Sequence, residues 1–495
     1  MLGWDSFKRP TFSAAALAAA MLLGASAAQA SPWAEVGDTQ LRSDIQVLAA
    51  AGGVDDITTQ WPLPWAGLVE SLERQGALDG EPAFVRAAAK RVLTAAHEQI
   101  PAHEIHASAT IDVASKPSVV YGYDGMGREK AQGAISGEVL LGDTTAIRIS
   151  AGGELSDWNN GHGRFVPDGS YIAQKIGGAV LYAGYLSQWW GPGWISALSL
   201  SNNAHPVPQI GIERLSTAPF QSPWLSWLGP WQMQFLVGVL DGPRVDQNTL
   251  YNGLRVTFSP LPGLQIGLAR TEEFCGSHHP CNPISYYFEF TNQKGHANHT
   301  NDEGVFDLHY TSMAWGTPFE LYGQVMNEDS NPIVHSDSSY LAGGSVWLPI
   351  GGSAVRLTAE YADTVPTDNI FSFGKLAYGS AYTNYSYVDG MRYRGRTLGF
   401  SLDGDSRLET LQASWIDGHD WTYTLTYDHA AISTRQFAYT NIVTTAPVTI
   451  NLGEARIKMP LSWATIEIAG RLQDDQPRPD HGFEGSVEAA LTFAL

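Results

Sequence analysis

Near its carboxyl end the chain reads Trp421-Thr422-Tyr423-Thr424-Leu425-Thr426-Tyr427-Asp428, which alternates apolar and polar side chains with a period of two. Successive side chains of a β-strand point to opposite faces, so this stretch predicts a strand with aromatics and a leucine on one face and threonines and an aspartate on the other. Alternating lipid-facing and lumen-facing residues, with aromatic rings near the membrane surfaces, are typical of outer-membrane barrels. The stretch therefore predicts an all-β transmembrane antiparallel barrel.

The amino-terminal residues have the organisation of a secretory signal peptide. Lys8 and Arg9 precede an apolar stretch from Phe12 to Leu23, and Ala28-Gln29-Ala30 supplies a small-x-small cleavage site. No later segment offers the roughly 18 consecutive apolar residues that a spanning helix needs. We therefore expect export with removal of residues 1–30, and a mature chain that crosses the outer membrane with strands.

The next part of the chain has helical periodicity. Asp38 or Thr39 can cap a first helix, Trp61-Pro62-Leu63-Pro64-Trp65 opens a second, and Pro82 lies near the start of a third. Beyond these helices the period of two returns and continues to the last residue. The predicted domains are a signal peptide at 1–30, a periplasmic helical bundle at 31–100 and an outer-membrane β-barrel at 101–495.

The connections between the predicted strands alternate between short and long. Phe306 to Tyr310 and Phe319 to Val325 flank Gly316 and predict a hairpin. Short turns are expected near Gly142-Asp143, Gly351-Gly352 and Gly418-His419, and longer polar connections at 272–303, 363–394 and 431–446. Short turns at one rim and long loops at the other are typical of bacterial barrels, whose long loops lie outside the cell.

The composition narrows the possible partners. The 495 residues include 50 acidic and 29 basic side chains, for a formal net charge of −21 at pH 7. Binding to a nucleic-acid backbone needs clustered cations, so we expect no nucleic-acid partner. Solvated acidic loops and an acidic lumen explain the charge. A polyanionic ligand would need a local basic patch or bridging divalent cations.

Catalytic motifs are sparse. The sequence contains no Gly-x-Ser-x-Gly elbow, no His-Glu-x-x-His and no phosphate-binding glycine loop. Asn160-Gly161-His162-Gly163 could place a histidine near Asp157, as an acyl hydrolase would require, but Asn-Gly is first a turn signal. We expect no enzymatic activity and no cofactor.

The chain has two cysteines, Cys275 and Cys281, on either side of Gly276-Ser277-His278-His279-Pro280. In an oxidising envelope the first interpretation is a local disulfide. A zinc site of two thiolates and two imidazoles is the alternative, but this ligand spacing is not a standard one. We expect the disulfide and no metal.

Several blocks together resemble the Wzi family of capsule-assembly outer-membrane proteins, over nearly the whole mature chain. They are Ser31-Pro32-Trp33, Leu41-Arg42-Ser43-Asp44, Trp61-Pro62-Leu63-Pro64-Trp65, Gln188-Trp189-Trp190-Gly191-Pro192-Gly193-Trp194, Ser201-Asn202-Asn203-Ala204, Ser222-Pro223-Trp224-Leu225-Ser226-Trp227-Leu228-Gly229-Pro230-Trp231 and Tyr393-Arg394-Gly395-Arg396-Thr397-Leu398-Gly399. The resemblance implies a barrel of about eighteen antiparallel strands with a periplasmic helical bundle. It also implies a surface lectin that holds capsular polysaccharide to the cell.

Two of these blocks are rich in tryptophan. The rings in Trp189 to Trp194 and Trp224 to Trp231 could stack on sugar faces. Membrane-interface girdles and packing against the helical bundle use the same residues, and we favour this structural interpretation.

The strongest anion patch in the sequence is Arg392, Arg394 and Arg396, which alternate and would share one side of a strand. An arginine facing lipid at mid-bilayer costs roughly 2–4 kcal/mol. We therefore expect these arginines at the outer rim, or turned inward by a bulge at Gly395. They could contact lipopolysaccharide phosphate, or bind the carboxylates of an acidic polysaccharide in a bidentate manner.

The loop before the arginines supplies Tyr382, Tyr385 and Tyr387, whose rings could stack on sugars. The candidate polysaccharide-binding residues are these tyrosines with the three arginines. The predicted function is an outer-membrane lectin that anchors capsular or extracellular polysaccharide, surrounded by outer-membrane lipid and lipopolysaccharide. The alternative is a channel for small polar or anionic solutes, which would need an open lumen.

Overall fold

A computed structural model describes residues 32–54, 57–74, 78–98, 105–142, 144–155, 163–279, 281, 300–328, 337–371, 376–435, 441–477 and 481–495. The predicted signal peptide at 1–30 lies outside the described residues, as do Asn160 to His162 and Asp157.

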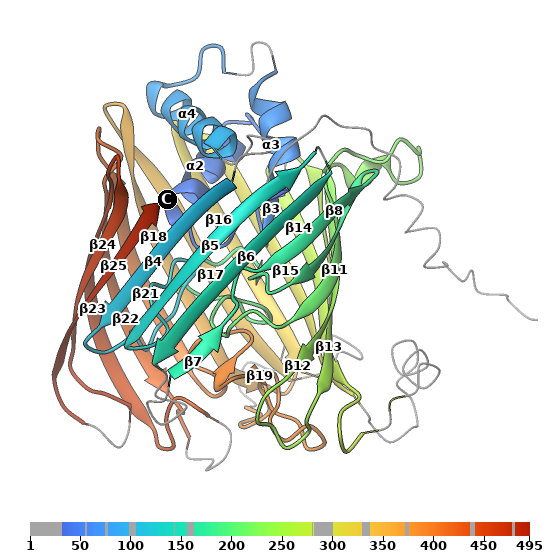
Figure 1. Ribbon diagram of the computed structural model, residues 1–495, viewed down its shortest axis with the longest axis vertical. Coiled ribbons are helices and arrows are strands. Elements are labelled where there is room, and N and C mark those ends of the chain that lie inside the picture. Colours follow the sequence, from blue (N-terminus) through green and yellow to red (C-terminus); the bar gives the residue numbers. More distant parts are fainter. Residues whose placement is uncertain are drawn as a thin grey trace, which may run out of the picture.

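The strands close into one antiparallel barrel (Figure 1). Its wall consists of β4 (Ile105–Ala114), β5 (Ala131–Leu141), β6 (Thr145–Leu155), β7 (Gly163–Val166), β8 (Tyr171–Ile176), β9 (Ala179–Gly184), β11 (Gln209–Arg214), β12 (Trp231–Leu240), β13 (Thr249–Leu261), β14 (Leu264–Phe274), β15 (Asn301–Ala314), β16 (Thr317–Glu328), β17 (Ser338–Ile350), β18 (Ser353–Thr367), β21 (Arg407–Ile416), β22 (Thr422–Ile432), β23 (Val448–Pro460), β24 (Ala464–Gln473) and β25 (Glu484–Ala494). These are nineteen labelled strands, but β7 and β8 pair with different parts of β6 and share one place in the wall, which leaves eighteen. The predicted fold class is confirmed.

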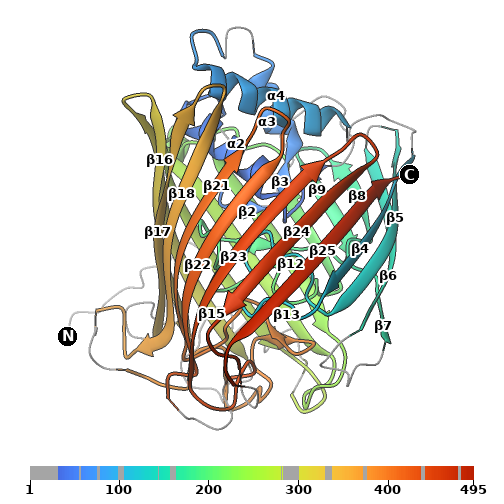
Figure 2. The same cartoon turned by 90° about the vertical axis from the view of Figure 1, so that its left-hand side faces the viewer.

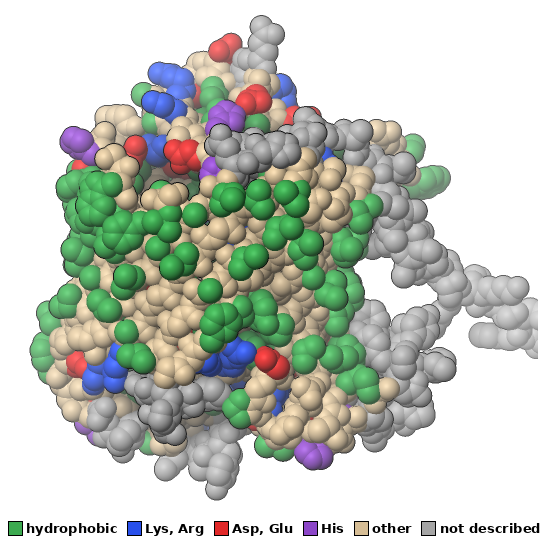
Figure 3. All heavy atoms as spheres, in the orientation of Figure 1, with side chains coloured by type: hydrophobic (Ala, Val, Ile, Leu, Met, Phe, Trp, Pro, Cys, Tyr) green, Lys and Arg blue, Asp and Glu red, His purple; other side chains and the backbone are tan. Residues whose placement is uncertain are grey.

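The wall has an apolar outside and a polar inside. On β22, Leu425 and Tyr427 are exposed on the outer face, while Thr424 and Asp428 are buried on the lumen face. The face assignment predicted from residues 421–428 is confirmed. On the face drawn in Figure 3, apolar side chains form a broad band across the barrel, and charged ones gather towards its two ends. This band is the surface that a membrane covers.

In the described part of the chain, no helix is both long enough and apolar enough to cross a membrane.

Three helices lie at one end of the barrel (Figure 2). They are α2 (Thr39–Ala50), α3 (Trp65–Leu72) and α4 (Ala83–Glu98), and they match the three predicted from sequence. Asp38 caps α2, because its carboxylate accepts a hydrogen bond from the Leu41 N–H at 2.9 Å. The helix is fixed to the barrel by Trp347, whose indole N–H donates to the Ser43 hydroxyl at 2.8 Å.

The two rims of the barrel differ. We call the rim with the helices and the short turns 314–317, 350–353 and 416–422 the helical end. We call the opposite rim, with the connections 240–249, 328–338 and 432–448, the loop end. The segregation of short and long connections agrees with the sequence pattern.

The lumen is filled by chain segments that leave the wall and fold inward. Trp189 and Trp190 (β10) pair with Gln60 and Trp61 (β2) as a short antiparallel ladder. The rings of Trp61 and Trp189 each lie 5.4 Å from that of Tyr123, and all three side chains are fully buried. The first tryptophan-rich block therefore packs inside the barrel, as the structural interpretation expected.

Buried polar side chains on the wall hold this inner layer in place. Glu360, on β18, accepts hydrogen bonds at 2.7 Å from the backbone N–H groups of Trp194 and Ser196. Gln324, on β16, accepts one from Leu198 N–H at 2.9 Å. These bonds satisfy backbone groups that would otherwise lie unpaired in the interior. The described lumen is thus a packed core with specific polar contacts.

Candidate functional site

Three arginines gather towards the loop end, on segments that are distant in sequence. Arg128 lies in the connection between β4 and β5. Arg394 and Arg396 lie on a small hairpin formed by β19 (Arg392–Tyr393) and β20 (Arg396–Thr397), which Figure 1 places at the end of the barrel opposite the helices. We call Arg128, Arg394 and Arg396 the arginine cluster.

The cluster is held in place by backbone carbonyls and by two carboxylates. Arg128 donates to the carbonyl oxygens of Asn202 at 2.6 Å and Asn203 at 3.2 Å, and Arg396 donates to the Asn203 side-chain oxygen at 3.3 Å. Arg394 lies 3.3 Å from the Asp241 carboxylate, while Asp168 lies 3.8 Å from Arg128. The charges of Glu129 and Glu154 also act on Arg396, so four carboxylates and several neutral oxygens together compensate part of the guanidinium charge.

The charges within the cluster affect one another. Burial and the neighbouring charge of Arg128 lower the pKa of Arg396, against the opposing effect of the Glu129 and Glu154 carboxylates. The side chains of Arg128 and Arg394 keep 12% and 16% of their surface exposed. Cations that repel each other at a partly open position gain free energy when an anion binds. The arrangement is therefore suited to carboxylate or phosphate groups, for which guanidinium offers paired donors.

The prediction that Arg392, Arg394 and Arg396 share one side of a strand is wrong. The chain turns back at Arg394 and Gly395, which both have positive φ (48° and 79°), so that Arg392 pairs with Thr397 across the hairpin. Glycine favours this tight turn, because it adopts left-handed backbone conformations without strain. The expected inward turn at Gly395 is thus a hairpin and not a bulge.

Arg392 has a different environment from the arginine cluster. It is buried, and its guanidinium donates to both oxygens of Asp403, at 2.9 and 3.0 Å. Asp403 is also fully buried and accepts a hydrogen bond from Ile442 N–H at 2.7 Å. Arg392 therefore ties the hairpin to two other loop segments and does not lie with the other two predicted arginines.

The three predicted tyrosines are also separated. Tyr382 is buried and donates to the Leu198 carbonyl. Tyr387 is buried, stacks on His279 with ring centroids 4.0 Å apart, and donates to the Cys275 carbonyl. Tyr385 is 73% exposed. Of the predicted tyrosines, only Tyr385 presents its ring at the surface where a sugar could stack on it.

Sequence reasoning missed Arg128 and Tyr121. The Tyr121 ring lies next to the guanidinium groups of Arg128 and Arg396, and its hydroxyl proton is shared between the carbonyl oxygens of Gly125 and Met126, both at 3.0 Å. Arg128 lies in an ordinary charged stretch, Arg128-Glu129-Lys130, which reads as a solvated turn. No local pattern indicates that it meets a hairpin far along the chain.

Cys275 and Cys281 are joined by a disulfide. The sulfur atoms are therefore not thiolate ligands, and the zinc alternative loses two of its four donors. The adjacent imidazoles contact an acid instead: Nδ1 of His278 lies 2.9 Å and Nε2 of His279 3.4 Å from the Asp246 carboxylate. The bonded loop thus packs against the loop end of the barrel through polar contacts and the ring of Tyr387.

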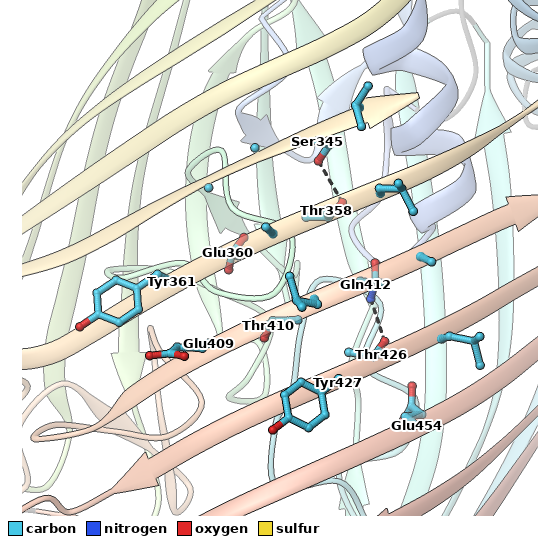
Figure 4. A pocket seen from close by; sticks show the side chains of 18 of the residues that line it. Ser345, Thr358, Glu360, Tyr361, Glu409, Thr410, Gln412, Thr426, Tyr427 and Glu454 are labelled. Carbon is cyan, nitrogen blue, oxygen red and sulfur yellow. Dashed lines mark hydrogen bonds between the residues drawn. The ribbon is translucent and has the colours of Figure 1, made fainter. Parts of the chain in front are cut away.

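A hollow of about 1470 Å³ lies on the wall formed by β16–β18 and β21–β24 (Figure 4). Small residues on the outer face line it, among them Ala342, Gly344, Ala359, Ala413, Gly453 and Gly470. The rings of Tyr361 and Tyr427 project beside it in Figure 4, whereas the hydrogen bonds Ser345–Thr358 (3.0 Å) and Gln412–Thr426 (3.2 Å) join lumen-facing side chains. Since the hollow faces lipid, it is not a candidate for polysaccharide.

Comparison with known proteins identifies the family to which this chain is similar. Residues 101–473 match the family model described as capsule assembly protein Wzi. An uncharacterized 55.8 kDa protein in the cps region of Klebsiella pneumoniae is 25% identical over 341 residues, which are 66% of this chain and 65% of that protein. The chain thus spans just under two thirds of the length of this relative.

A solved structure has the same fold. It is that of Wzi, an outer-membrane protein involved in group 1 capsule assembly in Escherichia coli and described as a carbohydrate-binding β-barrel. The superposition has a TM-score of 0.80 at 20% sequence identity, and covers 93% of this chain and 99% of the other.

Proposed function

The chain belongs to the Wzi family of capsule assembly proteins, and we propose that it is a non-enzymatic lectin that anchors capsular or extracellular polysaccharide at the cell surface. In this proposal the barrel spans the outer membrane, with the helical end in the periplasm and the loop end outside. The outward apolar band then contacts membrane lipid, and lipopolysaccharide surrounds the outer half of the wall.

The observation that carries the proposal is the arginine cluster, in a protein whose net charge is −21. An acidic protein repels an acidic glycan at long range, so binding needs a local group of cations. Arg128, Arg394 and Arg396 supply such a group, and Tyr385, in the connection between β18 and β19, exposes a ring at the loop end. Guanidinium pairs with carboxylate and aromatic faces stack on sugars, which fits an acidic polysaccharide.

The packing of the lumen supports a lectin over a channel. Trp61, Trp189, Trp190 and Trp194 lie buried across the barrel interior and are hydrogen-bonded to the wall or to the inner segments. A channel for polar solutes needs a continuous water-filled passage. The inner layer fills the described part of the lumen, where such a passage would have to run. A binding role needs no such passage.

The proposal is tested on cells that make the polysaccharide. Cells that lack the protein should release polysaccharide into the medium, and the wild-type gene should restore its retention on the surface. A variant with Arg394→Gln and Arg396→Gln should reach the outer membrane in normal amount and restore retention poorly. Full retention in cells that lack the protein would refute the anchoring role.

A further inference from the structure

The connection between β11 and β12, residues 215–230, has an unusual composition. It contains three prolines and two tryptophans but no charged residue. It joins Arg214 to Trp231 at the helical end, where most other connections are tight turns, and projects sideways from the barrel beside β11 (Figure 1). Contact with water alone does not explain why a long segment at this rim is uncharged and aromatic.

This connection folds back over the outer face of the wall. Gln232 and Gln234 point to the lumen, where Gln234 accepts from the Trp190 indole N–H at 3.0 Å, so Trp231 and Met233 point outward. Yet Trp231 and Met233 are only 4% and 7% exposed. Phe220 covers Trp231, with the rings stacked at 4.4 Å and an interplanar angle of 8°. The segment therefore occupies space that lipid fills elsewhere around the barrel.

Arg214 fastens the segment to the wall. Its guanidinium donates to the carbonyl oxygens of Ser216, Ala218 and Trp231, the last two at 2.8 and 2.7 Å, and lies 4.1 Å from the centre of the Trp231 ring. Trp231 N–H donates to Thr217 and Ser259 N–H donates to Pro230, at 2.9 and 2.8 Å. Irregular backbone against a membrane is stable only when its polar groups are paired in this way.

The outer side of the segment is apolar. The 3-10 turn Ser226–Leu228 presents Trp227, and Trp224 and Leu225 precede it. Trp224 is 85% and Trp227 63% exposed, whereas Trp231 on the wall is buried. This surface continues the outward apolar band of the wall, through Ile210 and Phe235 on the adjacent strands. Exposed tryptophan at the end of such a band is typical of the membrane–water interface.

We propose that residues 215–230 form a membrane-docking flap, in which Trp224, Leu225 and Trp227 insert into the interfacial layer of the phospholipid leaflet at the helical end. Arg214 and Phe220 hold the flap on the wall, and the prolines limit the number of unpaired N–H groups. The flap widens the barrel's contact with this leaflet. The proposal does not rest on polysaccharide binding, and it stands or falls separately.

Site-directed spin labelling of the full-length mature protein tests the flap. The two native cysteines are bonded to each other, so an introduced cysteine is the one free thiol to label. We would label Trp227→Cys, and Trp224→Cys as a second position in case the first does not fold. Leu411→Cys on the outer wall is the lipid reference, and His419→Cys in the polar turn between β21 and β22 is the aqueous reference at the same end.

Each variant is reconstituted in vesicles of phosphatidylethanolamine and phosphatidylglycerol, and its collision rates with oxygen and with a water-soluble nickel chelate are compared. The flap predicts an oxygen-to-nickel ratio at position 227 several-fold above that at 419 and closer to that at 411. A ratio equal to that at 419, in barrels whose gel mobility shows that they are folded, would overturn the proposal. These vesicles hold no other protein. That result would therefore leave a protein partner as the occupant of the surface formed by Trp224, Leu225 and Trp227.

Discussion

Arg128 and Arg396 share the ring of Tyr121: their guanidinium carbons lie 5.3 and 5.7 Å from its centre. The Arg396 guanidinium also donates to the Arg128 backbone carbonyl, across 268 positions of the sequence. Two like charges close to one aromatic ring are stabilised by the ring and repel each other. Their position is thus fixed by the fold while part of their charge stays available to an anion.

The first prediction concerns these charges. Replacing Arg394 and Arg396 together with Gln should weaken binding of an acidic polysaccharide about tenfold. Each partly exposed charge contact is worth roughly 0.5–1 kcal/mol, and two of them amount to about one decade in Kd. Titration of the detergent-purified variant with the polysaccharide measures the change.

The matched control is Arg86→Gln with Lys90→Gln, which removes the same net charge from the exposed face of α4. This variant should bind like wild type. If both double variants lose affinity equally, long-range charge and not the arginine cluster determines binding.

A second prediction separates Arg392 from its neighbours in sequence. Arg392→Met leaves the buried carboxylate of Asp403 without its cation, and removing one partner of a buried pair typically costs about 3–5 kcal/mol. The thermal unfolding midpoint should fall well below that of the Arg394/Arg396 variant. Adding Asp403→Asn should recover part of the loss, and an unchanged midpoint in the single variant would contradict the assigned pairing.

The third prediction is a pH dependence at Asp405, in the connection between β20 and β21. Burial raises the pKa of its carboxyl to about 6, against the effect of a hydrogen bond from Gly379 N–H. A raised pKa in the folded state means that its contribution to stability is complete below about pH 4 and is lost as the pH rises through 6.

Asp405→Asn keeps the side chain neutral at every pH, and asparagine tolerates the positive φ of 54° at this position. The variant should therefore be more stable than wild type at pH 7.5, by about 1–3 kcal/mol, and this difference should shrink towards pH 4. Thermal unfolding in detergent at both pH values measures it. A gain of the same size at both pH values would exclude titration of Asp405 as the cause.

A fourth prediction follows from the inner layer. In a planar lipid bilayer the wild-type protein should give no stable, porin-sized conductance, because buried tryptophans and their hydrogen bonds fill the described lumen. Under the same conditions a known porin should open channels of regular size. Regular conductance steps from the wild-type protein would favour the solute-channel alternative.

Local patterns in the sequence predicted the parts of the fold that depend on neighbouring residues. The alternation in residues 421–428 gave β22 its two faces, and Asp38 marked the start of α2, because periodicity and capping act over a few residues. Local patterns did not predict the packing of segments that are distant in sequence. The pairing of Trp189 with Trp61 depends on inward folding of two distant segments.

Local sequence patterns predicted the candidate site only in part. Arg394 and Arg396 were found from their spacing, but Arg392 was grouped with them because a strand was assumed where Gly395 makes a hairpin turn. Arg128 has no local signal, since its relation to Arg396 exists only once the β4–β5 connection and the hairpin meet at the loop end. A sequence pattern identifies types of residue, and the fold determines which of them act together.

The most direct test of the account is binding of the purified, folded protein to the extracellular polysaccharide of the strain that produces it, with an unrelated neutral polysaccharide as the control. We expect selective binding to the strain's own polysaccharide, weakened by added salt because charge contacts contribute to it. No binding at any salt or calcium concentration would contradict the lectin function.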